Sequence, residues 1–365
     1  MKNRRNKAKY FIHKKSKSIY NSNGKIIWFS YGDFIEKIVK GNHCFICGAE
    51  PGSKPFNSEH IIPKWILKHY GNDNSFMILP NRTEIKNNKY LVPCCSDCNA
   101  ELGNTLENPI KTLLCNSYKE VCEELEKDEN IYRKIYHWVA LVFFKTHLKD
   151  KYLLKERDRR KQSGVISDDY CWHCLYHIHN IIRQHYTGTR IANSAYGTIL
   201  VYESLREQEL QTFDYLDNLN SQVVMIQVGS IVIFVALTDC KASLGLYRTF
   251  LSKINGSLTI AQIREVFARL RYVIENLKYK PKFATLFKGK YPKIIAKIED
   301  KFAMYEGSQQ RKTLFELMRF YIGDAMPSNL PNRDKLLKDL EEGKAQYIFD
   351  ENYNFVQHTP YSLND

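Results

Sequence analysis

The segments GNHCFICGAEPGSKPFNSEHIIP (residues 41–63) and CCSDCNAELGNTLE (residues 94–107) contain two Cys-x-x-Cys pairs. Glu59 and His60 lie between the pairs, and Asn99 directly follows the last cysteine. Four thiolates in two tight pairs are typical of a closed, tetrahedral structural zinc site. We therefore predict a small zinc-stabilised fold whose ligands are Cys44, Cys47, Cys95 and Cys98.

The choice of ligands in the second pair depends on spacing. Cys94 and Cys95 are adjacent, but only Cys95 keeps a gap of two residues to Cys98. The metal must close a loop of 47 residues between the pairs. Zinc bound in this way contributes on the order of 10–16 kcal/mol to folding, which is enough to close it. Cys94 is then a spare or packed thiol.

The charge of the chain is concentrated around the cysteine pairs. The 365 residues are 44% hydrophobic, which predicts a globular protein, and the formal net charge is +14. Residues 1–108 carry 17 Lys and Arg against 9 Asp and Glu, which favours a polyanionic partner such as nucleic acid. The first twenty residues hold no acid and form a basic arm, although such an arm can also be a solubilising tail. The predicted nucleic-acid contacts are Arg4, Arg5, Lys7, Lys9, Lys14, Lys15 and Lys64.

Three observations indicate a cytoplasmic protein without a membrane segment. No apolar core follows the N-terminal charges, so we predict no signal peptide. The stretch Val223 to Leu237 is apolar, but Gln227 and the Gly229-Ser230 dipeptide interrupt it, as in two strands joined by a turn. Cysteines grouped as Cys-x-x-Cys favour metal binding in a reducing compartment over disulfides.

The predicted fold class is α+β, with three regions along the chain. These are a basic N-terminal arm (residues 1–24), a zinc-knuckle module (25–108) and a larger, mostly helical α+β domain (109–365). Apolar residues three and four positions apart predict helices at 110–126, 131–148, 169–186, 259–277, 313–321 and 333–342. The helix at 131–148 is expected to be amphipathic, with one apolar side. Strands are predicted at 198–202, 222–228 and 231–237, and the last twenty residues are expected to be poorly structured.

A second group of metal-ligand residue types falls in the helix expected at 169–186. On a helix, Cys171, Cys174 and His177 turn around the axis instead of converging. We therefore favour core packing for these residues over a second zinc site.

The order Cys-x-x-Cys, Glu-His-Ile-Ile-Pro, Cys-x-x-Cys-Asn resembles the HNH endonuclease family, in particular its zinc-tied members, over residues 41–107. The resemblance implies a ββα-metal fold that hydrolyses phosphodiester bonds with one divalent cation, magnesium or manganese. It implies that His60 is the general base and that Glu59 and Asn99 hold the cation. These types suit the roles, because imidazole abstracts protons near neutral pH and magnesium prefers oxygen ligands. Tyr90 stands where the family has the asparagine that orients the base, which leaves that role unassigned.

We therefore expect a metal-dependent HNH endonuclease that cleaves DNA, in a setting such as restriction or anti-phage defence. The alternative is a non-catalytic, zinc-stabilised nucleic-acid-binding protein, which would share the cysteines and the basic arm. In either case, residues 109–365 could bind a partner protein or a nucleotide.

Overall fold

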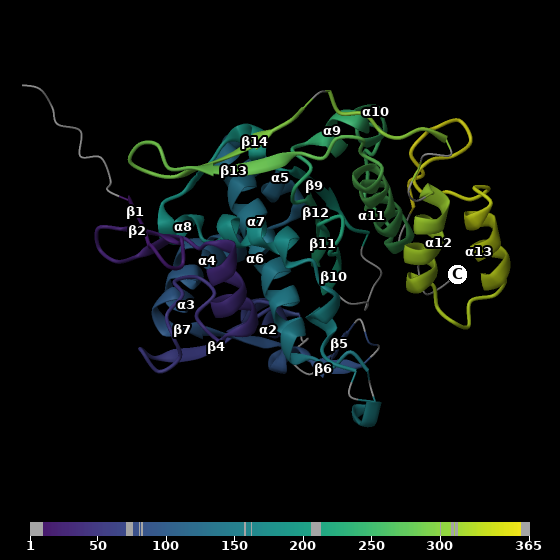
Figure 1. Ribbon diagram of the computed structural model, residues 1–365. Coiled ribbons are helices and arrows are strands. Elements are labelled where there is room, and N and C mark those ends of the chain that lie inside the picture. The colour runs from purple at the N-terminus through teal and green to yellow at the C-terminus, as the bar shows by residue number, and fades with distance from the viewer. Residues whose placement is uncertain are drawn as a thin grey trace, which may run out of the picture. The chain divides into compact units, whose positions relative to one another are not determined.

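The computed structural model describes residues 10–70, 76–79, 81, 83–156, 158–161, 163–205, 213–299, 301–307, 310 and 313–358 (Figure 1). These residues combine helices and strands, in agreement with the predicted α+β class. Contacts between Cα atoms divide the chain into two compact units. The first, here called the cysteine unit, comprises Met1–Cys115, Arg133–Ala195 and Phe283–Ile295. The second, called the sheet unit, comprises Asn116–Tyr132, Tyr196–Lys282 and Ala296–Asp365.

This division differs from the boundary expected after residue 108, because residues 133–195 group with the zinc-knuckle segment. The reason is a set of buried polar side chains. Lys145, His179 and Arg183 are almost completely buried, and each has a hydrogen-bond partner between Ile26 and His60. A buried charge or imidazole needs such partners, so the later helices fold together with the earlier segment.

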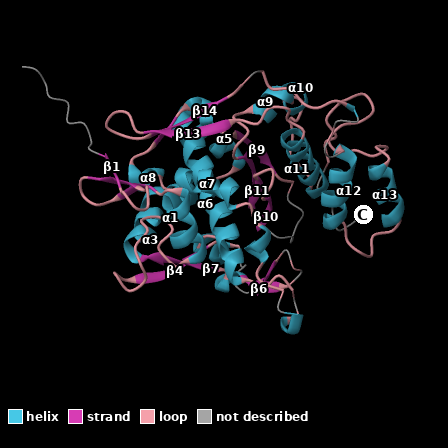
Figure 2. Ribbon diagram, in the orientation of Figure 1, coloured by secondary structure: helices cyan, strands magenta, loops and turns pink. Residues whose placement is uncertain are grey.

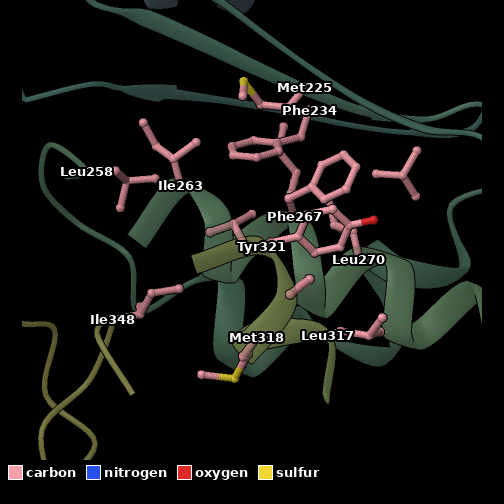
Figure 3. Close-up of a cluster of buried hydrophobic side chains, with 14 of the residues drawn as sticks. Met225, Phe234, Leu258, Ile263, Phe267, Leu270, Leu317, Met318, Tyr321 and Ile348 are labelled. Atoms are coloured by element: carbon pink, nitrogen blue, oxygen red, sulfur yellow. The ribbon is translucent and has the colours of Figure 1, made fainter. Parts of the chain in front are cut away.

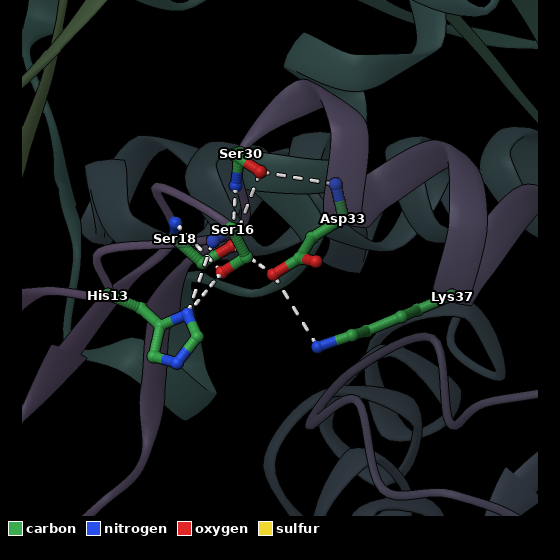
Figure 4. A network of polar contacts seen from close by, with 6 residues as sticks. All are labelled: His13, Ser16, Ser18, Ser30, Asp33 and Lys37. Atoms are coloured by element: carbon green, nitrogen blue, oxygen red, sulfur yellow. Dashed lines mark hydrogen bonds and ion pairs between the residues drawn. The ribbon is translucent and has the colours of Figure 1, made fainter.

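The N-terminal segment is a small sheet from Tyr10 onward, not an arm. The strands β1 (Tyr10–Ile12), β2 (Ile19–Asn21) and β3 (Ile26–Trp28) pair antiparallel. The helical turn α1 (Tyr31–Asp33) follows and continues as a π-helix, η1 (Phe34–Lys40). The fully buried Ser18 donates a hydrogen bond to the carboxylate of Asp33, which also pairs with Lys37 at 3.5 Å (Figure 4). This network ties the β1–β2 hairpin to the first helix.

A strand, a second strand and a helix form the centre of the predicted module. β4 (Phe56–His60) pairs antiparallel with β7 (Leu91–Cys95), and α3 (Ser96–Leu102) follows β7 directly (Figure 2). The helix begins at Ser96, because Cys95 ends the strand and serves as the N-cap residue. The segment between the strands contains α2 (Lys64–His69), β5 (Phe76–Ile78), β6 (Glu84–Lys86) and the 3₁₀-helix η3 (Asn87–Lys89). After α3 come the π-helix η4 (Gly103–Glu107) and α4 (Asn108–Leu114).

The core helix of the cysteine unit is α6 (Glu129–Lys149). Its side chains from Ile135 to Lys145 are all buried, where the sequence predicted burial on one side only. Ala140, Leu141 and Phe144 complete the apolar surface, and a helix that is apolar all round belongs in a core. Even so, none of the described helices has the combination of length and apolar character that a membrane span requires.

Shorter elements complete the cysteine unit. The helix α7 (Trp172–Ile182) packs on α6, with the rings of His179 and Phe144 5.2 Å apart. The remaining elements are the 3₁₀-helices η5 (Asp150–Tyr152), η6 (Arg159–Lys161), η7 (Ile166–Asp169) and η8 (Asn193–Ala195), the helix α8 (Gln184–Thr187), and the strands β8 (Arg190–Ile191), β13 (Lys282–Leu286) and β14 (Lys293–Lys297). The order in this second sheet is β13-β14-β8.

The sheet unit is built on a four-stranded antiparallel sheet of order β10-β11-β12-β9. The strands are β9 (Thr198–Glu203), β10 (Phe213–Asn218), β11 (Val223–Val228) and β12 (Ile231–Ala236). β11 and β12 confirm the predicted hairpin, whereas β10 was not predicted. Gly229 in the turn has a φ of +61°, a conformation that glycine adopts without strain.

Helices bury one face of this sheet. α11 (Ile260–Glu275) and α12 (Leu314–Ala325) carry Phe267, Leu317 and Tyr321 into a common core with Met225 and Phe234 of the strands (Figure 3). The remaining helices are α5 (Tyr118–Lys127), α9 (Ala242–Leu246), α10 (Arg248–Leu251) and α13 (Arg333–Glu341).

The end of the chain is better ordered than expected up to His358. Ile348 and Phe349 are buried in the core of the sheet unit. The buried carboxylate of Glu265 on α11 accepts hydrogen bonds from the backbone N–H groups of Tyr347 (2.6 Å) and Ile348 (3.2 Å). Residues 359–365 lie outside the described residues.

Candidate functional site

The structure brings the four predicted cysteines together. The sulfur atoms of Cys44, Cys47, Cys95 and Cys98 all lie within 4.8 Å of one another, and all four residues are buried. A tetrahedron with zinc–sulfur bonds of about 2.3 Å has sulfur–sulfur edges of roughly 3.8 Å, and the Sγ atoms of Cys47 and Cys95 are 3.6 Å apart. These four residues could hold a metal ion such as zinc. Cys94 is buried next to Cys44 but is not part of the group, in line with the spacing argument.

The first pair sits on a tight turn that only glycine can close. The N–H of Cys44 donates to the carbonyl of Ala49 (2.9 Å), and the N–H of Gly48 donates to the carbonyl of Cys44 (2.8 Å). Gly48 has a φ of +78°, and a Cβ atom there would lie 2.5 Å from Cζ of Phe29. In the second pair, Cys95 ends β7 and Cys98 lies one helical turn later on α3. The same Cys-x-x-Cys spacing therefore forms a tight turn at Cys44–Cys47 and the first turn of a helix at Cys95–Cys98.

The ionisation of the thiols depends on their mutual contacts. Hydrogen bonds from neighbouring thiols lower the pKa of Cys44. The hydrogen bond to Cys44 raises the pKa of Cys47 to about 11, and the pKa of Cys98 is also raised, first by its hydrogen bond to Cys44. Four buried thiols cannot all ionise without a positive charge between them, and a zinc ion supplies that charge by replacing the protons.

Two side chains of α7 and its end hold the first cysteine turn in place. His179 Nε2 donates to the carbonyl of Phe45 (2.7 Å), and Arg183 Nε donates to the carbonyl of Ile46 (2.6 Å). Arg183 also donates to the carbonyls of Ile26 (2.6 Å) and Ile27 (3.4 Å) of β3. Burial lowers the pKa of Arg183 to about 10, so the guanidinium stays charged at neutral pH and offsets part of the thiolate charge.

Glu59, a predicted metal ligand, lies in a buried ion-pair cluster. Its Oε1 atom is 2.6 Å from Nζ of Lys145 on α6, and the two side chains are 7% and 0% exposed. The same ammonium donates to the main-chain carbonyl of His60 (2.6 Å) and pairs with Oε1 of Glu107 at 3.5 Å.

The cluster has two carboxylates for one ammonium. Burial would lower the pKa of Lys145, but the charges of Glu59 and Glu107 outweigh it and raise that pKa, so the lysine is charged. Burial raises the pKa of Glu107, and the nearby charge of Glu59 raises it further, against the effect of Lys145. The raised pKa of Glu107 favours its neutral form, which leaves Lys145 and Glu59 as a balanced ion pair.

The other two predicted site residues lie at the same strand but not on one face. Asn99 Nδ2 donates to Oδ1 of Asn57 (2.8 Å), two positions before Glu59 on β4, which puts Asn99 on the Glu59 face of the strand. His60 is the next residue, so the pleat directs its Cβ to the opposite face, and its side chain is half-buried. The structure thus brings Asn99 to the Glu59 face of the strand. The backbone carbonyl of His60 and the carboxylate of Glu59 both accept hydrogen bonds from Lys145.

This donor set suits a hard divalent cation in its atom types. The carboxylates of Glu59 and Glu107 and the amide of Asn99 offer oxygen ligands, although Lys145 already neutralises Glu59. In geometry, the cysteine cluster is the one group of three or more His, Cys, Asp or Glu ligands that converges within the described ranges. That finding also leaves Cys171 and Cys174 outside a metal site; both are exposed, and His177 stacks on Phe283 at 3.9 Å.

The predicted nucleic-acid contacts fall into two groups. Lys14 and Lys15 are exposed in the turn of the β1–β2 hairpin, and Lys64 is exposed at the first residue of α2, four residues after His60. Arg4, Arg5, Lys7 and Lys9 lie outside the described residues. Tyr90, at the position of the family's orienting asparagine, is buried, and its carbonyl accepts a hydrogen bond from the N–H of Ile61 (3.0 Å).

Sequence reasoning missed Lys145, Glu107, His179 and Arg183. One signal was present for Lys145, because it is a charged residue at the end of the apolar run VALVFF (139–144), where a buried ammonium needs an acidic partner. Comparisons with models of protein families, with curated proteins and with solved structures give no match to this chain.

Proposed function

We propose that this chain is a metal-dependent endonuclease of the HNH type that hydrolyses phosphodiester bonds in DNA. The observation that carries the proposal is a strand–strand–helix arrangement, β4, β7 and α3, with the four-cysteine group at the junction of the second strand and the helix. Glu59 and His60 end the first strand, and Asn99 on the helix contacts that strand. The basic charge of residues 1–108 supports a nucleic-acid substrate.

Each residue has one role in this proposal. Zinc on the four cysteines holds strand and helix together. His60 accepts a proton from the attacking water, as a near-neutral imidazole can. Glu59 and Asn99 hold a magnesium or manganese ion, which when bound stabilises the charge that develops on the scissile phosphate. Lys14, Lys15 and Lys64 contact the phosphate backbone and do not select sequence.

The test is cleavage of supercoiled plasmid by the zinc-loaded protein with magnesium, with manganese and without added metal. We expect metal-dependent nicking or cutting that His60→Ala reduces by about 10²–10⁴-fold, the usual contribution of a general base. His69→Ala is the matched control, because His69 is an exposed histidine at the end of α2 and has no role in the proposal. A zinc-loaded protein that leaves DNA and RNA intact, or a His60→Ala variant as active as the wild type, would rule out this function.

A second candidate function is a non-catalytic, zinc-stabilised nucleic-acid-binding protein. It is favoured by one observation: Lys145 neutralises Glu59 in a buried ion pair, as expected of a structural carboxylate. Binding that weakens with salt, without any metal-stimulated turnover, would select this candidate over the nuclease.

A further inference from the structure

Lys145 is a fully buried lysine of the cysteine unit. Its side chain is 0% exposed, and it lies in the apolar core helix α6, 86 residues from Glu59 in the sequence. A buried ammonium is costly unless every N–H has a partner. A buried lysine of this kind either has a structural role alone or uses its charge to act on a nearby group.

The three partners of the ammonium indicate which group that is. Lys145 Nζ lies 2.6 Å from Oε1 of Glu59, 2.6 Å from the carbonyl of His60 and 3.5 Å from Oε1 of Glu107. One group thus contacts the side chain of Glu59 and the backbone of His60. These residues end β4, where the pairing of His60 with Leu91 is the last of the ladder. Just beyond this pair the N–H of Ile61 still donates to the carbonyl of Tyr90 (3.0 Å), and the ammonium adds a further fixed contact at the carbonyl of His60.

We propose that Lys145 is a positioning residue that directs the carboxylate of Glu59, fixes the backbone of His60 and weakens the binding of a divalent cation at Glu59. This inference rests on the proposed function and deepens it, because it makes α6, which lies outside the predicted module, part of the site. It also gives a physical reason why residues 133–195 group with the N-terminal residues.

Lys145 should improve the positioning of Glu59 and His60 but lower the affinity of the site for a divalent cation. The ammonium competes with a cation for the same carboxylate, since unit charges at hydrogen-bonding distance interact strongly away from bulk water. Without the ammonium, two carboxylates remain without a counter-ion, and a divalent cation is bound more tightly. The carboxylate and the backbone of His60 then lose their fixed directions, so turnover falls although binding improves. A residue that only stabilises the fold would change neither quantity in this way.

The experiment compares Lys145→Met with the wild type as full-length, zinc-loaded protein. Calorimetric titration with Mn²⁺, without nucleic acid, is expected to show about tenfold tighter binding in the variant. Plasmid cleavage at saturating Mn²⁺ is expected to be at least about tenfold slower, because the reacting groups are less well positioned. Unchanged or weaker Mn²⁺ binding, or unchanged cleavage, would overturn the proposal.

Lys151→Met is the matched control. Lys151 is a partly buried lysine of the same unit, but it donates to the main-chain carbonyls of Ile38 (2.8 Å) and Gly41. Within the part of the chain that the structure describes, it pairs with no carboxylate. The control is expected to lower the melting temperature without tightening Mn²⁺ binding. If it tightens Mn²⁺ binding as much as Lys145→Met does, the effect is not specific to Glu59 and the proposal fails.

Glu107→Gln keeps the proposal testable if Lys145→Met does not fold. It replaces one carboxyl group by an amide that cannot ionise and leaves the contact between Lys145 and Glu59 in place, so Mn²⁺ binding, which favours the ionised form of Glu107, is expected to weaken by about tenfold. Unchanged binding in this variant would count against the cluster as a cation site.

The two proposals fail in different ways. Mn²⁺ affinities that change as expected without any cleavage by the wild type overturn the nuclease and support Lys145. Wild-type cleavage with no change in Lys145→Met overturns the role of Lys145 alone. A zinc-loaded wild type that binds no Mn²⁺ overturns both.

Discussion

The two compact units differ in the charges that they bury: among the described residues the buried Lys and Arg side chains belong to the cysteine unit, whereas the sheet unit buries the carboxylate of Glu265 within a largely apolar core. In the cysteine unit, Lys145 and Arg183 are fully buried and bind carboxylates or main-chain carbonyls of the segment around the four cysteines. In the sheet unit, every residue of β12 is buried and apolar, and α11 covers the sheet with residues such as Phe267. Apolar burial responds gradually to the area lost, whereas a buried charge depends on each partner. We therefore expect the loss of a single polar partner to destabilise the cysteine unit strongly, whereas the sheet unit should lose stability in proportion to the apolar area removed.

Removal of zinc is the strongest way to separate the units. We expect loss of the metal to cost the cysteine unit on the order of 10 kcal/mol, which is comparable to the whole stability of a domain, about 5–15 kcal/mol. Hydrogen exchange after treatment with a chelator should show loss of protection in β4, β7 and α3, while β11 and β12 stay protected. Substitution of Cys98 by Ser should reproduce the result, and substitution of the exposed Cys115 should not.

Equal loss of protection in both units would contradict this comparison. It would mean that the sheet unit depends on the metal as much as the cysteine unit does.

Arg183→Met and Phe267→Ala form a matched pair across the two units. Arg183→Met leaves three main-chain carbonyls without their donor, and Phe267→Ala opens a cavity in the apolar core; both should cost about 3–5 kcal/mol. Only Arg183→Met should speed the release of zinc, because its partners include Ile46 between the first two cysteines. Denaturant unfolding gives the stabilities, and a chromogenic chelator gives the release rates.

Faster zinc release in Phe267→Ala would show that the stability of the metal site depends on the sheet unit. Slow release in Arg183→Met would show that the cysteine turn keeps its shape without the guanidinium.

Much of the fold could be predicted because its signals are local. The Cys-x-x-Cys spacing, the Gly229 turn and the apolar periodicity of α11 each lie within a short stretch of sequence. The buried ion-pair cluster of Lys145, Glu59 and Glu107 could not be predicted, because Lys145 and Glu59 are 86 residues apart and no spacing rule joins them. The same holds for Arg183 and Ile46, which are 137 residues apart. The buried polar partners that define the cysteine unit therefore required the structure, and so did its boundary.

The next test uses acid, to which the cysteine unit should be more sensitive. Burial lowers the pKa of His137 from 6.5 to about 4, and its Nε2 donates to the carbonyl of Ile182 (2.9 Å). Between these pH values the unfolded chain binds a proton that the folded chain does not, so the free energy of unfolding falls as the pH drops from 6.5 to 4. The full shift corresponds to about 3 kcal/mol. His137→Gln keeps a donor for Ile182 and should make the melting temperature less steep across this window. Burial also lowers the pKa values of His177, His179 and His185, so these residues contribute the remaining slope.

The control for acid sensitivity is the exposed His69, whose replacement by Gln should leave the pH profile of the wild type unchanged. A profile for His137→Gln as steep as that of the wild type would place the acid sensitivity in other groups.

The smallest expected effect tests whether the sheet unit responds by degrees. Thr259 caps α11: its hydroxyl accepts from the N–H of Gln262 (3.3 Å), and the side chain of Gln262 accepts from the N–H of Thr259 (2.9 Å). Thr259→Ala should cost about 1 kcal/mol, measured as a shift of the denaturant midpoint, with zinc release unchanged. Thr249→Ala, at an exposed position within α10, should cost less.

A loss above about 3 kcal/mol in Thr259→Ala would mean more than a lost cap. Gln262 also donates to the carbonyls of Tyr347 (3.0 Å) and Val356 (2.8 Å), so such a loss would show that the cap holds the C-terminal segment in place. The sheet unit would then depend on a polar contact as sharply as the cysteine unit does.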